Sequence, residues 1–424
     1  MRLRRPHFLF AALCAATVVT ACSDDIPTAS GEDAFPPQGR ASTFDVLLSA
    51  DSLTVEVGRF SDYTGPGDAA YLIVADDFGG VLDAHALVRF TDAPQSVQFS
   101  SGGITFIDTA FVYAPGNLIA RVDTSASAAA GTVLQLWAVG QEWSPANTTW
   151  ERATDSTLWQ EPGGTRAELL SEASATPSAG DSVLLPLDSA QVARIADPDF
   201  PGLLLTARGA PGRVRLTLAG LATALRPASR TDTTIAQTLM QGPRTFIFTP
   251  EPPRSVGAWE AGGIRSARTL FRLRIPDRIS ACGDPPPTSC GTVALEDVTV
   301  NSASLLFTPV PVPGGFGPLG TTTLSLRSVF EPGLGRAAPL GPLVTDQRFV
   351  GAATVFAQGR LAPGDTVVAI PIGQYLQSVA RADSTAVTLA LLGEPEAASF
   401  GVAWFQPAAR LRIVYTLPSR TPLP

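Results

Sequence analysis

The feature that most constrains this chain is a short alternation of apolar and polar residues, ended at close intervals by glycine or proline. Clear examples are "SLTVEV" (52–57), "RVRLTL" (213–218) and "RLRIVY" (410–415). A period of two places the apolar side chains on one face of a strand. Helical patterns are brief and occur only near 188–197 and 373–383. We therefore expect an all-β fold of antiparallel, jelly-roll-like β-sandwiches.

The chain also contains an internal duplication. Three matches occur in the same order with offsets of 181 to 184 residues: 50–55 with 231–236, 84–90 with 267–273, and 180–197 with 364–383. A period of this length corresponds to whole domains rather than to solenoid repeats. We expect two tandem sandwiches, at 44–228 and 229–420, followed by a tail at 421–424.

The N-terminus predicts export. Three arginines precede the apolar run "LFAALCAATVVTA" (9–21), which is too short for a permanent transmembrane helix. The run ends at Cys22 and resembles the lipobox of bacterial lipoproteins. The resemblance implies that residues 1–21 are a signal peptide and that Cys22 carries acyl chains. An ordinary signal peptide with a chance cysteine is the alternative.

Lipidation would make the membrane a partner of the chain through the acyl chains on Cys22. Residues 22–43 are polar and acidic and contain proline and glycine, which predicts a flexible tether. Ser23 follows the cysteine, and in the lipoproteins of double-membraned bacteria this implies the outer membrane. The formal net charge of −8 and the absence of a basic run beyond the signal argue against nucleic-acid binding.

Two cysteines of the exported part can pair. Cys282 and Cys290 delimit "CGDPPPTSC", whose three prolines stiffen a short loop. Disulfides persist in exported proteins, so we expect a bond between these two residues. The spacing does not indicate a metal site, because no histidine or second cysteine pair is near.

The order of the motifs resembles the DNRLRE-type β-sandwich, a family related to jelly-roll carbohydrate-binding modules. The first copy has "HALVRF" (85–90), "APGNLIARV" (114–122) and a "W…TW…P" segment at Trp143, Thr149, Trp150 and Pro162. The second copy closes with "PAARLRIVYT" (407–416) but lacks the "W…TW" segment. The resemblance implies carbohydrate-binding-like sandwiches, with any ligand role of this segment confined to the first copy.

Residues 136–159 hold four of the six tryptophans. Trp137 alternates with apolar residues and is expected in the core. Trp150 stands where the resemblance implies a ring that plugs one end of the sandwich. Trp143 and Trp159 lie among polar residues, so we expect partial exposure. Trp143, Trp150 and Trp159 are accordingly candidates for stacking on sugar rings, and core packing is the alternative for each.

Arginine residues form a second candidate ligand-binding site. Arg213 and Arg215 lie on the face of their strand opposite the aliphatic residues. Neighbouring strands with the same pattern would present a row of guanidinium groups, suited to the carboxylates of an acidic polysaccharide. An ordinary solvated sheet face is the alternative.

We expect no enzyme activity. The exported part has one histidine, His85, in a strand pattern that favours a structural role, and no G-x-S-x-G or HExxH motif occurs. No cofactor is expected, although loop acids at Asp76–Asp77 or Asp197 and Asp199 could supply oxygens to a structural calcium ion. Two functions remain: a lipid-anchored carbohydrate-binding protein, or a structural lipoprotein that contacts other envelope proteins.

Overall fold

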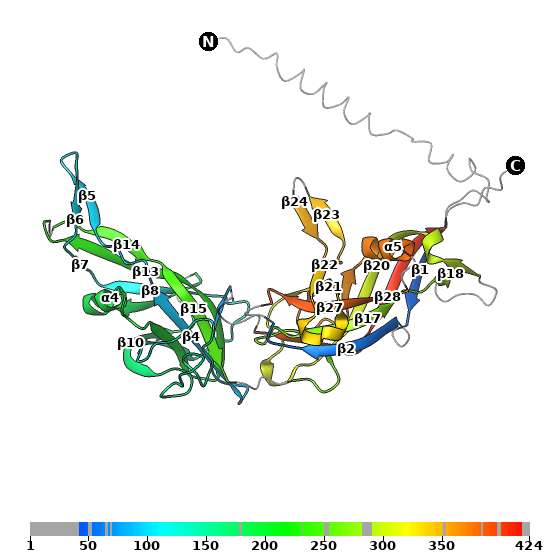
Figure 1. The fold of residues 1–424 in the computed structure, drawn as a ribbon, viewed down its shortest axis with the longest axis horizontal. Helices are drawn as coiled ribbons and strands as arrows, with labels where there is room; N and C mark the ends of the chain where they lie inside the picture. Colours follow the sequence, from blue (N-terminus) through cyan, green and yellow to red (C-terminus); the bar gives the residue numbers. More distant parts are fainter. Residues whose placement is uncertain are drawn as a thin grey trace, which may run out of the picture.

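The computed structural model describes residues 42–49, 53–63, 67, 70–177, 180–230, 232–249, 254–281, 291–350, 353–382, 385–396 and 400–417. The predicted lipidation site Cys22 and the predicted disulfide partners Cys282 and Cys290 lie outside these residues. The all-β expectation is confirmed, because the chain folds into antiparallel sheets. Figure 1 shows two lobes side by side.

The strands of the first lobe follow the alternation seen in the sequence. Along β13, for example, Val214, Leu216 and Leu218 are buried and face the core. The strands of this lobe are β3 (Leu72–Phe78), β4 (Leu82–Phe90), β5 (Val97–Ser101), β6 (Ile104–Asp108), β7 (Phe111–Tyr113), β8 (Gly116–Val122), β9 (Thr132–Val139), β10 (Arg166–Ser174), β11 (Ser182–Leu187), β12 (Leu203–Gly209), β13 (Gly212–Pro227), β14 (Ile235–Leu239) and β15 (Gln241–Phe248).

The second lobe is built in the same way. Its strands are β1 (Ser42–Leu48), β2 (Thr54–Phe60), β16 (Trp259–Gly262), β17 (Arg268–Arg274), β18 (Arg278–Ser280), β19 (Thr292–Ala294), β20 (Thr299–Val310), β21 (Thr322–Val329), β22 (Leu340–Leu343), β23 (Gln347–Val350), β24 (Ala353–Phe356), β25 (Gly359–Leu361), β26 (Val368–Pro371), β27 (Ala386–Glu394) and β28 (Val402–Leu417). Short 3₁₀ turns are η3 (Leu295–Asp297), η4 (Pro313–Gly315) and η5 (Pro332–Ala337).

Each lobe carries one α-helix where the sequence predicts a helical pattern. These are α4 (Ser189–Ile195) and α5 (Gly373–Arg381). At the start of α4, the Asp188 side chain accepts a hydrogen bond from the Gln191 N–H, and the Gln191 side chain accepts one from the Asp188 N–H. This reciprocal cap satisfies two otherwise free donors and fixes where the helix begins.

The two lobes repeat the same strand order. In the first lobe one layer runs β14-β13-β8-β11 and the other β15-β4-β12-β9-β10. In the second lobe the matching layers run β1-β28-β20-β26 and β2-β17-β27-β21-β22. Strand β3 pairs with both β13 and β4, which joins the layers of the first lobe into one sheet of 11 strands. The repeats at 84–90 and 267–273 therefore occupy equivalent strands, β4 and β17.

The leading strand pairs are exchanged between the lobes. Strands β1 and β2 lie at the start of the first repeat but pair with β28 and β17 of the second. Strands β14 and β15 lie at the start of the second repeat but pair with β13 and β4 of the first. The predicted division at 228/229 is therefore corrected: strands β1 and β2 complete the second lobe, and strands β14 and β15 complete the first. Paired strands lie far apart in the sequence, so the local pattern of a strand does not predict which strand it pairs with.

An apolar contact joins the lobes. The ring of Phe78, at the end of β3, meets the edge of Phe316 at a centroid distance of 5.0 Å and that of Phe400 at 5.2 Å. Both partners lie within the second repeat in sequence, yet they belong to the buried cluster of the first lobe together with Ile264. The lobes thus share part of one core at their junction.

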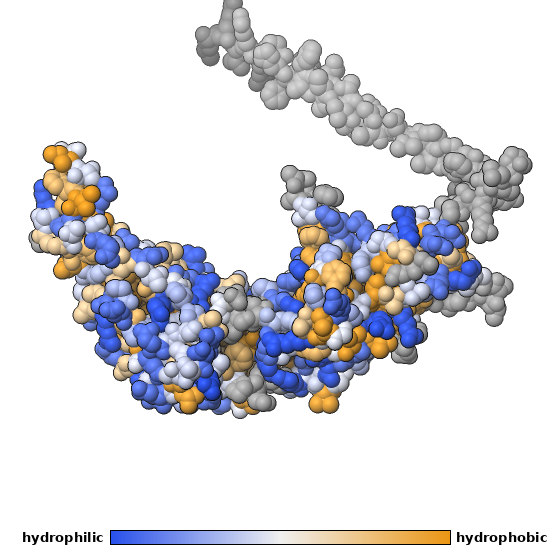
Figure 2. Space-filling model, in the orientation of Figure 1, coloured by the Kyte–Doolittle hydropathy of each residue, from blue (hydrophilic) through white to orange (hydrophobic). Residues whose placement is uncertain are grey.

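The hairpins β5–β6 and β23–β24, like the shorter hairpin β18–β19, pair with no other strand within the described part of the chain. Figure 1 shows β5–β6 and β23–β24 extending from the same side of the molecule, one from each lobe. The first carries exposed apolar side chains at Ile104, Phe106 and Ile107, and the second at Val355 and Phe356. Orange, hydrophobic atoms mark the tip of the first hairpin in Figure 2.

Over the described ranges, the structure contains no helix with the length and apolar character needed to cross a bilayer.

Candidate functional site

The tryptophan-rich segment forms a packed cap on the outer face of the β4–β12–β9 sheet. Trp143 and Trp159 are only 3% and 5% exposed, and they pack with Leu87, Leu204 and other apolar residues of these strands. The prediction that these two rings are partly exposed is therefore wrong. Their polar neighbours in the sequence lie on the outside of a loop that folds back onto the sheet. The polarity of these neighbours therefore did not predict that the rings are buried.

Hydrogen bonds fix the two buried rings in place. Trp143 Nε1 donates to the Pro201 carbonyl at 2.9 Å, and Trp159 Nε1 donates to the Thr149 carbonyl at 3.0 Å. Arg89 lies over the Trp143 ring at 5.0 Å from its centroid and donates to the Trp143 carbonyl at 3.0 Å. With their donors satisfied inside the protein, these rings offer neither a free face nor a free N–H to a sugar.

The third candidate ring, Trp150, lies against His85 with ring centroids 4.8 Å apart. His85 donates from Nδ1 to the Gly163 carbonyl at 2.6 Å, which fixes the neutral tautomer. Burial lowers the pKa of His85 to about 4. A neutral, hydrogen-bonded histidine below a half-buried ring is a packing element, in line with the structural role expected for it.

The arginines of β13 turn toward the junction rather than toward solvent. Arg213 is 1% exposed. Arg215 pairs with Asp123, with Nε 3.0 Å from Oδ2. The predicted open guanidinium row is therefore wrong for both residues. The pattern correctly separated the two faces of the strand, but it could not show that a second lobe covers the polar face.

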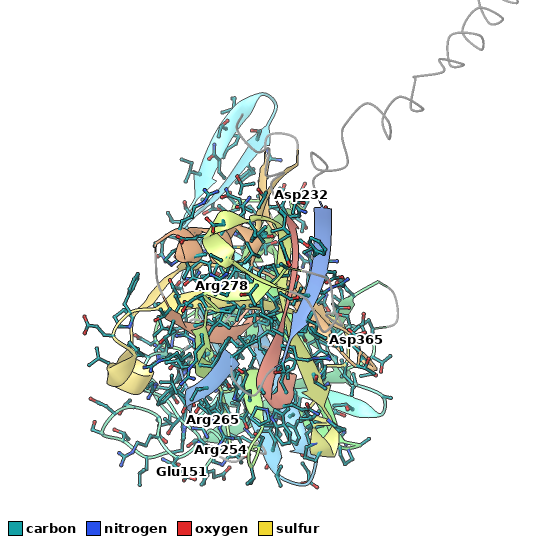
Figure 3. All side chains as sticks on the ribbon, turned by 90° about the vertical axis from the view of Figure 1, so that its right-hand side faces the viewer. Glu151, Asp232, Arg254, Arg265, Arg278 and Asp365 are labelled. Carbon is teal, nitrogen blue, oxygen red and sulfur yellow. The ribbon has the colours of Figure 1, made fainter. Side chains whose placement is uncertain are left out.

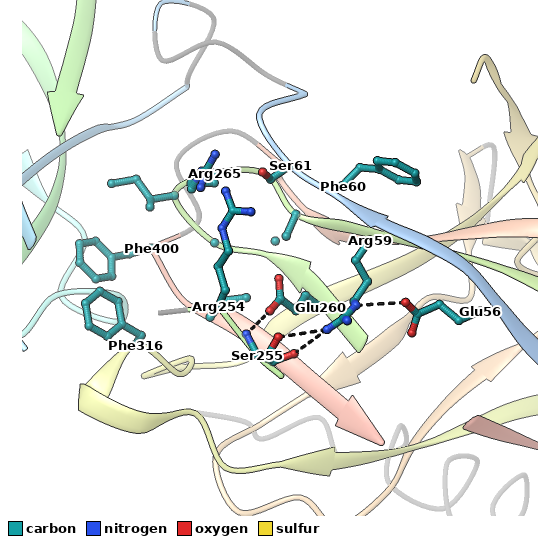
Figure 4. A pocket seen from close by; sticks show the side chains of 15 residues that line it. Glu56, Arg59, Phe60, Ser61, Arg254, Ser255, Glu260, Arg265, Phe316 and Phe400 are labelled. Atoms are coloured by element: carbon teal, nitrogen blue, oxygen red, sulfur yellow. Dashed lines mark hydrogen bonds and ion pairs between the residues drawn. The ribbon is translucent and has the colours of Figure 1, made fainter. Parts of the chain in front are cut away.

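A cavity of about 320 Å³ opens beside the junction, and we call it the junction pocket. Figure 4 shows its side chains, which come from segments far apart in the sequence. The end of β2, the segment around β16 and the loops near 316 and 400 supply the lining: Glu56, Arg59, Phe60, Ser61, Arg254, Ser255, Glu260, Gly262, Gly263, Ile264, Arg265, Ala267, Phe316, Phe400 and Val402. The volume lies at the lower end of the range for small-ligand sites.

Three arginines line the junction pocket together with Glu56 and Glu260, and two of the arginines are already engaged. Arg59 donates to Glu56 at 3.1 Å and to the carbonyls of Ser255 and Ala258, each at 3.1 Å. Arg265 forms a bidentate pair with Asp62, at 2.9 and 2.5 Å. These contacts hold the wall of the pocket in a fixed shape.

The third arginine, Arg254, is exposed, and its guanidinium forms no ion pair with any described carboxylate. In Figure 4 its side chain extends toward that of Arg265, and Figure 3 places both residues at the same end of the molecule. Arg254 is therefore the group with spare capacity for an anion. The pocket has an apolar floor from Ile264, Phe316 and Phe400, which are buried and expose only small edges.

Asp62, which pairs with Arg265 in this wall, is ionised at neutral pH. Burial would raise the pKa of Asp62, but the hydrogen bonds and charge of Arg265 outweigh it and hold the pKa below the usual value. Glu260 accepts from the Ser255 N–H at 2.5 Å. The acids around the pocket thus serve as hydrogen-bond acceptors in its wall, and the arrangement is suited to binding an anion.

Among the described residues, no group of three acidic, histidine or cysteine side chains lies close enough together to bind a metal ion. Asp197 instead accepts the Asp199 N–H at 2.9 Å, and Asp83 accepts the Asp77 N–H at 2.7 Å. These contacts stabilise turns.

The sequence analysis missed the junction pocket. Its residues are spread over 56–61, 254–267, 316 and 400–402, and strand exchange brings them together. The local signal was the stretch "RSVGAWEAGGIR" (254–265), in which two arginines flank a Gly-Gly pair. Gly262 and Gly263 have positive φ values of 76° and 78°, and they turn the chain so that Arg265 faces Asp62.

Comparisons with known proteins give no family for this chain. No family model matches it, and no curated protein matches it. The resemblance to DNRLRE-type sandwiches therefore remains an expectation from the motifs.

Solved structures show only distant likeness. The C-terminal domain of the Streptococcus pyogenes antigen I/II-family protein AspA has 8% identity and a TM-score of 0.13, covering 89% of this chain and 91% of that one. The C-terminal domain of the Streptococcus agalactiae antigen I/II polypeptide BspA has 7% identity and a TM-score of 0.11, covering 88% and 90%. TM-scores this low indicate neither a shared fold nor a shared function.

Proposed function

We propose that this chain is a non-catalytic, lipid-anchored protein of the cell envelope that binds an acidic polysaccharide at the junction pocket. The observation that carries the proposal is the exposed guanidinium of Arg254 in a cavity of about 320 Å³ whose other arginines are held by ion pairs and hydrogen bonds. A sugar carboxylate can accept two N–H bonds from such a group. The apolar floor offers contact to the C–H face of the ring.

The anchor belongs to the same proposal and rests on the lipobox-like sequence at Cys22. Acyl chains on this residue would hold the protein at the outer membrane, and residues 22–43 would tether the two lobes to it. Mass spectrometry of the mature N-terminus tests this part on its own. An acylated Cys22 is expected, and an unmodified N-terminus elsewhere would contradict the anchor.

A glycan array probed with the purified protein tests the binding. Uronic-acid glycans are expected to bind, neutral glycans of similar size are not, and the signal should fall as salt is raised. Arg254→Gln should remove the binding. Arg152→Gln is the matched control, since Arg152 is an exposed arginine on the cap of the first lobe. An equal loss of glycan binding in both variants, or equal binding of glycans with and without a carboxylate, would contradict the site.

A second function is favoured by a different observation, the apolar hairpins. Ile104 and Ile107 are 62% and 71% exposed on a hairpin whose outer edges pair with no described strand. Such edges and side chains are typical of contacts with another protein. An assembly role predicts a discrete cross-linked product in cells from a photo-crosslinker at position 107. A crosslinker at Glu151, on the cap, serves as the control, and no product from position 107 would contradict the role.

A further inference from the structure

The β5–β6 hairpin exposes apolar side chains on both of its faces. Successive residues of a strand point alternately to the two faces of a sheet. Ile104 and Phe106 therefore share one face, and Ile107 lies on the other face, opposite Gln98 of β5. All three apolar side chains are exposed, and residues 97–107 contain no charged residue. The outer part of this hairpin thus presents apolar groups on both sides and carries no charge.

The β23–β24 hairpin has the same character. Val355 and Phe356 are successive residues of β24, so their side chains point to opposite faces, and both are exposed. Residues 347–356 contain a single charged residue, Arg348. Exposed apolar groups of this size mark a contact with a protein or with a membrane. A protein that packs against one face of a hairpin leaves the other face in water, so apolar groups on both faces favour a membrane.

An aspartate fixes each hairpin at its base. The Asp108 side chain accepts the Ala110 N–H at 2.9 Å and the Ser229 N–H at 3.0 Å, which ties the base of β5–β6 to the segment after β13. The Asp346 side chain accepts the Gln374 N–H at 3.0 Å, which ties the base of β23–β24 to the start of α5. Each hairpin therefore has a polar base held to its lobe and an apolar part beyond it.

The two hairpins point the same way, and the chain enters the lobes from that side. Figure 1 shows both hairpins extending from one side of the two lobes. Figure 3 shows the cyan β5–β6 hairpin and the start of the blue β1 strand at one end, with Glu151 at the opposite end. About 20 residues separate the proposed acyl anchor at Cys22 from β1, a length that reaches roughly 25 Å as a coil. An anchored chain would therefore turn the hairpins toward the membrane.

We propose that the outer parts of both hairpins insert into the interfacial region of a phospholipid bilayer and so fix the orientation of the two lobes on the membrane. The inference rests on the membrane anchor of the proposed function for the side that faces the bilayer, and it does not depend on sugar binding. The second function proposed for these hairpins, contact with another protein, is the competing outcome of the test.

The backbone of the hairpins limits the depth of insertion. The outer edges of β5–β6 pair with no described strand, and unpaired backbone groups are not tolerated in the hydrocarbon core. Insertion therefore stops in the interface, where water and headgroups can still form hydrogen bonds. The rise from Ile104 to Ile107 is about 10 Å, which matches the depth of roughly 5–10 Å reached by apolar side chains of interfacial elements.

Quenching of a fluorophore by quencher groups on the lipid tails tests the proposal. The chain from Ser23 onward is held on phosphatidylcholine vesicles by an N-terminal histidine tag and a nickel-chelating lipid, so the result does not depend on acylation. An environment-sensitive fluorophore on Ile107→Cys or Val355→Cys should be quenched. The same fluorophore on Leu158→Cys, an exposed apolar position of the cap, should not. The chain without an added cysteine, treated with the same reagent, gives the background.

Salt dependence distinguishes insertion from binding by charge. Residues 97–107 are uncharged, so insertion is hydrophobic and needs no anionic lipid. Quenching at position 107 should be the same in about 0.1 M and about 0.5 M sodium chloride, whereas a charge-driven contact weakens as salt is raised. Quenching that disappears at the higher concentration would contradict hydrophobic insertion. Sugar binding at the junction pocket is measured without vesicles, so its failure would not affect this result.

A charged substitution assigns the effect to the hairpin. With the fluorophore at position 104, Ile107→Asp should lower the ratio of inserted to free hairpin roughly tenfold, because the apolar contribution of the isoleucine is lost and the carboxylate has to stay hydrated. Leu158→Asp is the matched control and should leave the ratio unchanged. No quenching at positions 104, 107 and 355, or equal quenching at position 158, would overturn the proposal. Absence of quenching together with a discrete protein cross-link from position 107 would assign the hairpins to a protein partner instead.

Discussion

Protonation of His85 should destabilise the first lobe below neutral pH. The folded state holds this ring neutral, with a pKa of about 4 because of its burial. In the unfolded chain the ring has its ordinary pKa of about 6.5. Between these two values the unfolded state binds one more proton than the folded state, so the free energy of unfolding falls as the pH falls. Stability from this group is complete above about pH 6.5 and is progressively lost toward pH 4.

The magnitude follows from the two pKa values. Linkage gives a loss of about 2 kcal/mol between pH 7 and pH 5, and about 3 kcal/mol when both states are protonated. Carboxylates also titrate, so the variant His85→Asn is needed as a reference. Its amide can still donate to the Gly163 carbonyl but does not titrate in this range.

The assay is urea unfolding followed by tryptophan fluorescence, since four of the six tryptophans lie in the cap beside His85. Unfolding free energies are measured for both proteins at pH 7 and pH 5. The unmodified protein should lose about 2 kcal/mol more than His85→Asn. Equal losses in the two proteins would refute the burial and neutral state of the ring.

Three further predictions concern the fold. Deletion of residues 42–60 should unfold the second lobe and leave the first lobe folded, because β1 and β2 pair with β28 and β17; limited proteolysis that spares 254–417 would contradict this. Trp143→Ala should cost about 3–5 kcal/mol in the unfolding free energy of the first lobe, whereas a loss below about 1 kcal/mol would indicate a surface ring. Cys282 and Cys290 should be disulfide-bonded in the exported protein, and labelling of two free thiols in native protein would rule the bond out.

Much of the fold could be predicted from the sequence, because strand alternation is a local property. The pattern of β13 and β28 identified the faces that carry Val214 and Ile413, both of which are buried. The helix at 189–195 was predictable from its own cap. Strand partners depend instead on residues far apart in the chain, so the exchange of β1 and β2 with β14 and β15 left no local signal.

The site was harder to predict for the same reason. Polar neighbours predicted an exposed Trp143, but the loop that carries it folds onto the sheet and buries the ring. Alternation predicted a solvated face for Arg213, but the second lobe covers that face. Arg254 was not predicted as a site residue, because the pocket that it lines is assembled from four separate segments of the chain.

Isothermal titration of the purified protein with an acidic oligosaccharide, beside its carboxyl-reduced neutral analogue, tests the proposed function most directly. The account predicts saturable binding of the acidic form, no binding of the neutral form, and a loss of about tenfold or more in affinity for Arg254→Gln, the effect of removing one charge-assisted hydrogen bond. Equal affinity for the two sugars, or an affinity for the acidic sugar that Arg254→Gln leaves unchanged, would contradict it.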